Sequence, residues 1–344
     1  MNRPYITGKI EISELTVPQV STRLEFIDFL GAVMVRWGIR REKYTVAPGL
    51  YAVGDPIAES DVFVTSNYKL TFDHLRKNLP EIDGWILVLD TKGVNVWCAA
   101  GKGTFGTNEL VKRIREVSLE KIVSHKRLIL PQLGATGVAA HKVKEQTGFN
   151  VHYGPVLASD IKKFISDGYR ADKAMRKVKF GFIDRIKLIP NDFMYGKYYL
   201  LASIAILAFL SGLSSKGLSF QNFYANSGES ILTVFLAYVA GIVITPLLLP
   251  YLPGKQFSLK GLFSGTVLFA GIFLLRPAGH KMMETFSWLF IIGAISSFVA
   301  MNFTGSSTYT SLSGVKKEMK LFVPVQISFA IIGIAMQLIG KLIL

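Results

Sequence analysis

The strongest constraint on this sequence is a change in composition near residue 197. Of its 39 Lys and Arg and its 24 Asp and Glu, residues 198–344 hold only nine and three. Too few charges remain there to coat a soluble domain of five buried helices, so the sequence predicts an all-α transmembrane domain of five helices over residues 198–344. Its five apolar stretches, each close to the roughly 17 to 25 residues that cross a bilayer, are 198–213, 231–249, 259–275, 285–303 and 321–339.

A basic segment comes directly before the first apolar stretch and accounts for much of the net charge of +15. This position suits anionic lipid headgroups and retention on the cytoplasmic side of a membrane. A nucleic-acid module would interleave aromatic residues with such a run on a recognisable platform, and this segment does not. We therefore expect membrane lipids and no nucleic acid as partners of the basic residues, which are Arg170, Lys173, Arg176, Lys177, Lys179, Arg185, Lys187 and Lys197.

The loops between the apolar stretches predict an orientation. Basic residues are denser in the second and fourth loops than in the first, although two on the third loop dilute the pattern. Residues 1–18 lack the continuous apolar run of a signal peptide. We expect a multi-pass protein of the cytoplasmic (inner) membrane, with its N-terminal domain in the cytoplasm and its C-terminus outside. The second loop and its end carry Lys255 and Lys260, and the fourth loop carries Lys316, Lys317 and Lys320. The first loop carries only Lys216, and the third carries Arg276 and Lys281.

The middles of the apolar stretches contain no acidic or basic residue, although transporters and proton relays usually keep one there. The predicted helices are therefore interpreted as an anchor or docking platform. A channel for a neutral or thiolate-bound substrate stays open as an alternative.

The first 170 residues alternate short apolar runs with amphipathic helical patterns, which predicts an α/β parallel-sheet domain covered on both faces. Residues 1–40 are expected to be a loosely structured start followed by a helix over 23–37. The predicted domains are 1–170, a cytoplasmic α/β domain; 171–197, a basic juxtamembrane linker; and 198–344, the transmembrane domain. The runs, each strand followed by its helix, are 62–65 and 69–79, 85–89 and 109–123, 128–130 and 136–146, and 151–156 and 159–165.

Cys98 is the only cysteine, so it can act only singly, as a nucleophile, a redox group or one metal ligand. Asn95 is a good N-cap and would place Cys98 at the third position of a helix, where free N–H groups and the helix dipole favour a thiolate. A small buried hydrophobe is the alternative interpretation.

Other catalytic patterns fail. The sequence Gly101–Gly106 matches G-x-G-x-x-G, but ten residues separate it from the preceding apolar run, so a dinucleotide fingerprint is disfavoured. The five histidines show no paired metal-ligand spacing, and there is no G-x-S-x-G elbow.

The octapeptide from Asn95 to Lys102, Asn-Val-Trp-Cys-Ala-Ala-Gly-Lys, resembles the signature of the mercury-methylating corrinoid protein family. Residues 49–54, 64–71 and 148–155 resemble the corrinoid-binding domain of the large corrinoid iron–sulfur protein subunit. By motif the resemblance covers roughly residues 40 to 170.

This resemblance implies a corrinoid-dependent methyltransferase that passes a methyl group from methylcob(III)alamin to Hg(II), giving methylmercury. The cofactor would be cobalamin or a related corrinoid, with the Cys98 thiolate as the lower axial ligand of its cobalt. Thiolate donation through the metal suits an electrophilic acceptor such as Hg(II). One cysteine cannot hold an iron–sulfur cluster, so a ferredoxin-like iron–sulfur electron donor is the implied protein partner, and a methylated folate is the implied methyl donor.

A corrinoid usually rests on backbone and small side chains, and several such residues follow predicted strand ends. Ordinary turn chemistry is the alternative for each. The implied corrinoid contacts are Asn95, Val96, Trp97, Cys98, Ala99, Ala100, Gly101, Lys102, Thr65, Asn67, Gly134, Ala135, Thr136, Gly154 and Pro155.

Two other functions remain open. One is a membrane-anchored corrinoid methyl carrier for ordinary one-carbon metabolism, and the other is a transporter with a nucleotide-sensing cytoplasmic domain. Bound cobalamin would exclude the transporter, and methylmercury formation would exclude the ordinary carrier.

Overall fold

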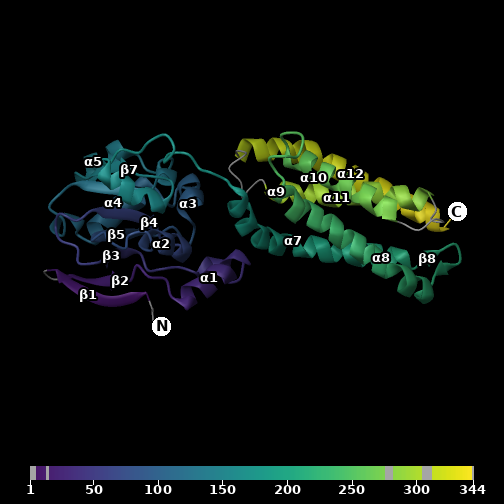
Figure 1. Cartoon of the computed structure of the whole chain (residues 1–344), viewed down its shortest axis with the longest axis horizontal. Coiled ribbons are helices and arrows are strands. Elements are labelled where there is room, and N and C mark those ends of the chain that lie inside the picture. The colour runs from purple at the N-terminus through teal and green to yellow at the C-terminus, as the bar shows by residue number, and fades with distance from the viewer. Residues whose placement is uncertain (1–4, 13–14, 276–281, 304–311, 343–344) are drawn as a thin grey trace. The chain divides into compact units, whose positions relative to one another are not determined.

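The computed structural model describes residues 5–12, 15–275, 282–303 and 312–342. The chain divides into two compact units, Met1–Lys179 and Phe180–Leu344 (Figure 1). Arg276 and Lys281 of the third predicted loop, His280, which is one of the five histidines, and Leu344 lie outside the described residues.

The described strands of the first unit form one seven-stranded sheet in the order β1-β2-β3-β5-β4-β6-β7. The pairs β4–β5, β4–β6, β6–β7 and β2–β3 are parallel, whereas β1–β2 and β3–β5 are antiparallel. The expected parallel-sheet α/β fold is thus confirmed as a mostly parallel sheet. The strands are β1 (Ile6–Ile12), β2 (Leu15–Val20), β3 (Gly49–Val53), β4 (Val62–Ser66), β5 (Gly84–Leu89), β6 (Arg127–Leu130) and β7 (Asn150–Tyr153).

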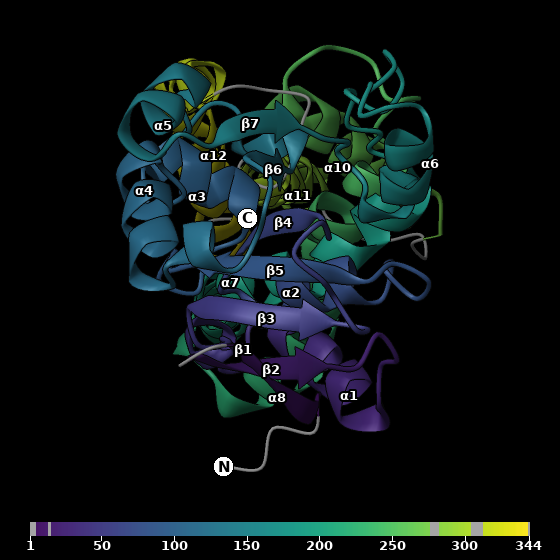
Figure 2. The same ribbon diagram turned by 90° about the vertical axis from the view of Figure 1, so that its left-hand side faces the viewer.

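Helices cover both faces of this sheet (Figure 2). One core includes side chains of α3, α4 and α5, and the other includes side chains of α2 and α6. Trp85, Leu87 and Leu89 of β5 face the first core, and Ile86 and Val88 face the second, as the period of two in a strand requires. The helices are α1 (Phe26–Arg36), α2 (Lys69–Arg76), α3 (Val96–Lys102), α4 (Thr107–Glu116), α5 (Ala140–Thr147) and α6 (Ile161–Ser166), with short 3-10 turns η1 (Arg41–Lys43), η2 (Leu119–Lys121), η3 (Gln132–Gly134) and η4 (Ala158–Asp160).

The expectation of a loosely structured start was wrong. Strands β1 and β2 pair in an antiparallel hairpin at the edge of the sheet, and β1 alternates half-buried and exposed residues along its whole length. Only one face of this edge strand packs on the core, so its apolar residues are too sparse to resemble the continuous runs of the central strands. The expected helix over 23–37 is confirmed as the shorter α1.

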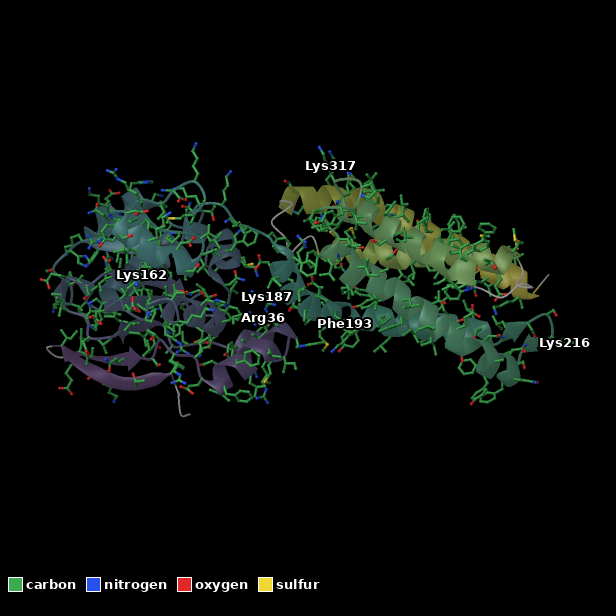
Figure 3. All side chains as sticks on the ribbon, in the orientation of Figure 1. Arg36, Lys162, Lys187, Phe193, Lys216 and Lys317 are labelled. Atoms are coloured by element: carbon green, nitrogen blue, oxygen red, sulfur yellow. The ribbon has the colours of Figure 1, made fainter. Side chains whose placement is uncertain are left out.

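Within the described residues of the second unit, five helices are long and apolar enough to cross a membrane, as expected. Figure 3 shows Lys187 and Lys317 near one end of this unit and Lys216 at the other. The elements are α7 (Phe182–Ser211), β8 (Leu213–Ser214), β9 (Gly217–Leu218), α8 (Phe220–Val239), the π-helical turn η5 (Ala240–Ile244), α9 (Thr245–Leu247), α10 (Phe257–Leu275), α11 (Met282–Asn302) and α12 (Leu312–Leu342).

The first and last of these helices are longer than their apolar stretches. Helix α7 begins at Phe182, so Arg185, Lys187 and Lys197 of the basic segment lie within it. Helix α12 contains Glu318, whose buried carboxylate accepts hydrogen bonds from the backbone N–H and the hydroxyl of Ser258, at 2.7 and 2.9 Å. The apolar pattern therefore marks only part of these two helices, the C-terminal half of α7 and the middle of α12.

Candidate functional site

Four parallel strands end at the same edge of the first unit's sheet. Strands β5, β4, β6 and β7 are neighbours in that order, and all four run in the same direction. Parallel sheets bind ligands at the carboxyl ends of their strands. Helix α3, which carries Cys98, follows the end of β5 at this edge.

Helix α3 begins as expected from Asn95. The Asn95 side chain is the N-cap and accepts a 2.9 Å hydrogen bond from the backbone N–H of Cys98, so Cys98 is the third helical residue. Its thiol is exposed, which disfavours the alternative of a small buried hydrophobe. Gly103 ends the helix with a φ of 80°, a left-handed conformation that glycine adopts without strain.

The two faces of α3 differ sharply. Val96, Ala99 and Ala100 are buried in the core beneath the helix. The remaining octapeptide residues of the helix face outward: Trp97 is 43% exposed, and Cys98, Gly101 and Lys102 are exposed beside it. Apart from the backbone of α3 itself and the two neighbouring residues, no described atom lies within 4 Å of the position that a Cβ atom at Gly101 would occupy. This outward face, Trp97, Cys98, Gly101 and Lys102, is called the α3 face below.

Asn67 holds the turn that leads into α3. Its side-chain oxygen accepts hydrogen bonds from the backbone N–H and the hydroxyl of Thr91 and from the backbone N–H of Gly93, at 3.1, 2.9 and 3.0 Å. Its amide nitrogen donates to Asp90. Asn67 is buried, and the structure gives its side chain this positioning role beside the expected site.

The same turn carries a fixed negative charge. Burial raises the pKa of Asp90, but hydrogen bonds from the side chain and backbone of Lys92 outweigh burial and hold that pKa below its ordinary value. The backbone N–H of Asp90 donates to Glu109 of α4, which also pairs with Arg113 at 2.7 Å. The turn before α3 is therefore tied to both β4 and α4.

The loop after β6 supports α3 from below. A Cβ atom at Gly134 would lie 2.5 Å from the ring of Phe105, and one at Gly137 would clash with the carbonyl oxygen of Phe105 and lie 3.0 Å from Cα of Ala100. Glycine is therefore needed at both positions to let α3 and the segment after it pack on this loop. Gly134 is buried by this packing, whereas Ala135 is partly exposed and Thr136 exposed.

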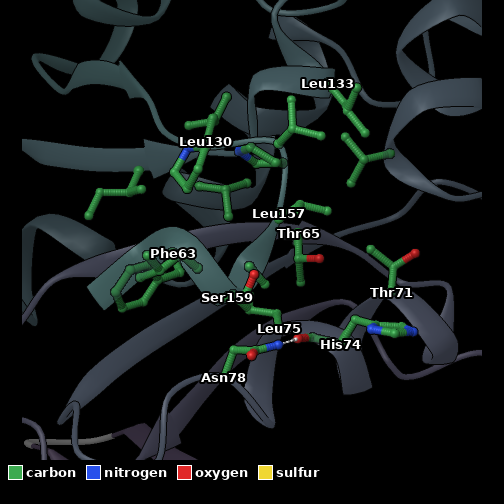
Figure 4. A pocket seen from close by; sticks show the side chains of 18 of the residues that line it. Phe63, Thr65, Thr71, His74, Leu75, Asn78, Leu130, Leu133, Leu157 and Ser159 are labelled. Carbon is green, nitrogen blue, oxygen red and sulfur yellow. Dashed lines mark hydrogen bonds between the residues drawn. The ribbon is translucent and has the colours of Figure 1, made fainter. Parts of the chain in front are cut away.

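A pocket of about 370 Å³ opens on the α2 and α6 side of the same edge. Its size lies within the range of small-molecule pockets. Thr65, Thr71, His74 and Ser159 place polar groups among mostly apolar walls, and Asn78 donates a 2.7 Å hydrogen bond to the carbonyl of His74 (Figure 4). Val96, the first residue of α3, also lines the pocket, together with Leu130, Leu133 and Pro155.

The pocket lies at the point where the strand order reverses. From β4 the chain passes to β5 on one side, and then to β6 on the other side of β4. Strands β4 and β6 pair through Phe63 and Ile129 alone, and both residues line the pocket. In open parallel sheets this reversal is the usual ligand position.

The expected contact residues divide into three groups. Thr65, Val96 and Pro155 line the pocket. Trp97, Cys98, Gly101 and Lys102 form the exposed α3 face. The others, Asn67, Asn95, Ala99, Ala100, Gly134 and Gly154, support the strand ends and α3 from within, and Ala135 and Thr136 lie on the loop beneath the helix. Which of these residues contact a cofactor stays a prediction.

Sequence reasoning missed several residues at this edge. Thr71 and His74 of α2 line the pocket from a helix that was treated only as sheet cover. The hydroxyl of Ser66, the last residue of β4, is fully buried and has no hydrogen-bond partner among the described residues. Because side chains alternate between the two faces of a strand, Ser66 lies on the face of Val64 toward the first core, opposite Thr65 of the pocket.

Comparison with known proteins covers the part of the chain that builds this edge. Residues 37–165 match the model of the CO dehydrogenase/acetyl-CoA synthase delta subunit family. The gamma subunit of the acetyl-CoA decarbonylase/synthase complex of Archaeoglobus fulgidus is 33% identical over 131 residues, which are 38% of this chain and 27% of that subunit. The gamma subunit from Methanopyrus kandleri is 38% identical over 128 residues, 36% of this chain and 27% of the relative.

The large subunit of the corrinoid/iron–sulfur protein of Moorella thermoacetica is 32% identical over 117 residues, 33% of this chain and 26% of that subunit. The chain thus spans about a quarter of the length of these curated relatives. The matched segment contains α3, the pocket and every expected contact residue. Residues 37–165 therefore form a domain related to corrinoid protein subunits of the CO dehydrogenase/acetyl-CoA synthase type.

Proposed function

We propose that this chain is a membrane-anchored, corrinoid-dependent methyltransferase that transfers a methyl group to Hg(II), with the Cys98 thiolate as the lower ligand of the cobalt. The observation that carries the proposal is the exposed position of Cys98 in the first turn of α3, within a domain related to corrinoid protein subunits. The choice of Hg(II) depends on the resemblance of the octapeptide from Asn95 to Lys102 to that of mercury-methylating proteins.

The residues at the site fit a flat, bulky cofactor. The α3 face offers the aromatic ring of Trp97, the thiol of Cys98 and open space over Gly101. The pocket beside Val96 has room for a peripheral arm of a large ligand and offers the hydroxyls of Thr65 and Thr71. A bound corrinoid would supply a cobalt centre that accepts and releases methyl groups.

The chain's own residues would fix the ligand atom and tune it. The Asn95 cap holds the first turn of α3, and Asn67 holds the turn before it, so the thiol has a fixed position at the edge of the sheet. If a corrinoid is bound, the sulfur of Cys98 would hold its cobalt as a strong donor, and the cofactor would supply methyl-transfer chemistry suited to an electrophile such as Hg(II).

The partners follow from the same proposal. Turnover requires a reductant for the cobalt, and a ferredoxin-like iron–sulfur protein is proposed as the electron donor. A methylated folate is proposed as the methyl source. The relatives named above are subunits of multi-subunit or iron–sulfur proteins by their names, which supports a protein partner in general.

The test uses the full-length protein in lipid nanodiscs, supplied with cobalamin, a reductant, a methyl donor and Hg(II). Methylmercury is measured by mass spectrometry, and the cobalt ligation by the visible spectrum. We expect Cys98→Ala to retain cobalamin but to shift its spectrum to a base-off or water-ligated form and to abolish methylmercury formation. Cys98→Ser keeps the side-chain shape with a far weaker donor, and is expected to behave like Cys98→Ala. Full methylmercury formation by either variant with an unchanged spectrum would refute the role of Cys98.

A second candidate function is ordinary methyl transfer in one-carbon metabolism, which the names of the relatives favour. The same preparation distinguishes the two. A chain that binds cobalamin and passes the methyl group to a thiol acceptor but not to Hg(II) would be the ordinary carrier.

A further inference from the structure

Helix α1 has its polar and apolar faces reversed relative to a helix on a water-exposed surface. Asp28, Gly31 and Val35 face the domain, at the i, i+3 and i+7 positions of one helix face. Asp28 and Val35 are 4% and 2% exposed, and Gly31 lies against the ring of Tyr44. A helix of a water-soluble protein usually turns its apolar stripe inward and its charges outward.

The inward face is held by buried ion pairs. Asp28 pairs with Lys69 and with Arg76 of α2, each at 2.6 Å, and both cations also pair with Asp73. Two hydrogen bonds from Arg76 to the carbonyls of Ser21 and Arg23, at 2.6 and 2.8 Å, fix the segment before α1. Because removal of one member would leave a buried charge unpaired, this cluster fixes which face of α1 points outward.

The outward face is strongly apolar. Phe26 is 76% exposed and Phe29 63%, and Leu30 and Trp37 are each 42% exposed on the same side. Ile27 flanks this face at 55%. Monomeric soluble proteins rarely expose several large apolar side chains side by side, and such a patch marks a contact with a protein or a membrane.

The charges around this face favour a membrane. Arg36 in the last turn, then Arg40, Arg41 and Lys43 just beyond it, place four cations at one end of the apolar face (Figure 3 labels Arg36). Trp37 lies at the junction of the two, as tryptophan does at the headgroup level of a bilayer. Basic residues beside an apolar helical face are typical of helices that lie in the interface of anionic membranes. The same chain carries five helices suited to cross that membrane.

We propose that α1 lies in the plane of the membrane interface, with Phe26, Phe29 and Trp37 among the acyl chains and Arg36 and Arg40 at anionic headgroups. Helix α1 precedes the matched segment 37–165, so the related subunits give no partner for it. The buried cluster joins α1 to α2, and α2 carries Thr71, His74 and Leu75 of the pocket wall. Contact with lipid would therefore fix the orientation of the pocket toward the bilayer. This inference is independent of the proposed methyl transfer.

The test measures the depth of labels in lipid. The full-length chain with Cys98→Ser, which removes the only native thiol, receives Phe29→Cys or, as the control, Lys142→Cys on α5, which covers the opposite face of the sheet. Each variant carries a nitroxide in nanodiscs that contain phosphatidylglycerol. Paramagnetic resonance compares the access of oxygen, which concentrates in lipid, with that of a water-soluble nickel complex. We expect the Phe29 label to favour oxygen and the Lys142 label to favour nickel.

Two results would overturn the proposal. A Phe29 label as accessible to nickel as the Lys142 label would place α1 in water. A label that is immobile and shielded from both reagents would place protein, either the helical unit of this chain or a second copy, on the apolar face. As a charge test, we expect Arg36→Gln with Arg40→Gln, or replacement of phosphatidylglycerol by phosphatidylcholine, to raise nickel access at the Phe29 label. If nickel access at the Phe29 label changed neither with the double substitution nor with the lipid replacement, the role of anionic headgroups would be refuted.

Discussion

The side-chain oxygen of Asn95 lies 2.9 Å from the backbone nitrogen of Cys98 and accepts its hydrogen bond. This bond satisfies one of the free N–H groups at the start of α3 and starts the helix at Val96, so the Cys98 side chain lies on the exposed α3 face. The only cysteine of the chain is thus positioned by a capping residue three positions before it.

We expect Asn95→Ala to loosen the first turn of α3. Loss of an N-cap costs about 1 kcal/mol, and the short helix has few other interactions to compensate. Hydrogen exchange at the Cys98 amide should accelerate, and cobalamin affinity should fall. Asn95→Ser, which retains a capping oxygen, is the matched control. Equal acceleration in both variants would mean that the cap does not position the cysteine.

Substitutions at Gly137 and Gly101 test two different things: the packing of the domain and the access of a ligand to the α3 face. Gly137→Ala should destabilise the first unit by about 1 to 3 kcal/mol, because its Cβ would press on Phe105 and Ala100. Gly101→Ala meets no described atom within 4 Å and should stabilise α3 by up to about 1 kcal/mol. If the α3 face holds the cofactor, Gly101→Ala should nevertheless weaken cobalamin binding, measured by spectral titration beside a thermal melt. Unchanged cobalamin affinity in Gly101→Ala would remove this face from the site.

The contacts made by residues 171–179 predict different thermal stabilities for two fragments of the first unit. Met175 is 4% exposed in the second core, and its carbonyl accepts a 2.8 Å hydrogen bond from Val156, which lines the pocket. A fragment of residues 1–179 should therefore fold on its own and bind cobalamin, whereas one of residues 1–170 should melt at a lower temperature. Equal melting temperatures would show that residues 171–179 do not contribute to the domain.

His152 should make the stability of the first unit depend on pH. Burial and the nearby Arg127 guanidinium lower the pKa of His152 below its ordinary 6.5 in the folded protein. As the pH falls, His152 therefore binds a proton in the unfolded chain before it does so in the folded chain. The free energy of unfolding should consequently fall as pH drops below about 6.5. His152→Gln should flatten this dependence, followed through the fluorescence of the buried Trp85. The same slope in wild type and variant would assign it to other groups.

The proposed orientation can be tested at the C-terminus. Five crossings after a cytoplasmic domain would place a reporter fused after Leu344 outside the cytoplasm. Alkaline phosphatase activity, which requires export, should be high in this fusion, and a fusion after Lys216 should also be active. If the C-terminal fusion had no phosphatase activity while the fusion after Lys216 was active, one of the later helices would not cross the membrane.

The sequence alone predicted the elements whose residues are apolar along their whole length. The apolar runs of β4, β5 and β6 could be located because these strands are covered on both faces, and the five helices because they are apolar all round, as a membrane span requires. The Asn95 cap of α3 could be predicted because capping acts between residues three positions apart. The edge hairpin of β1 and β2 was missed because only one of its faces is buried.

Contacts between distant segments were decided by the tertiary structure. The expected ligand contact of Asn67 stays a prediction, and the structure adds that its side chain fixes the turn at Thr91 and Gly93, 24 and 26 residues further along the chain. Glycine at 134 and 137 is required by Phe105 and Ala100, which no local pattern indicates. The sequence of α1 showed an apolar helix but not which face is outward, since that depends on the ion pairs of Asp28 with Lys69 and Arg76. Periodicity and capping are short-range properties of the chain, whereas the face that a residue presents is set by whatever the folded chain packs against it.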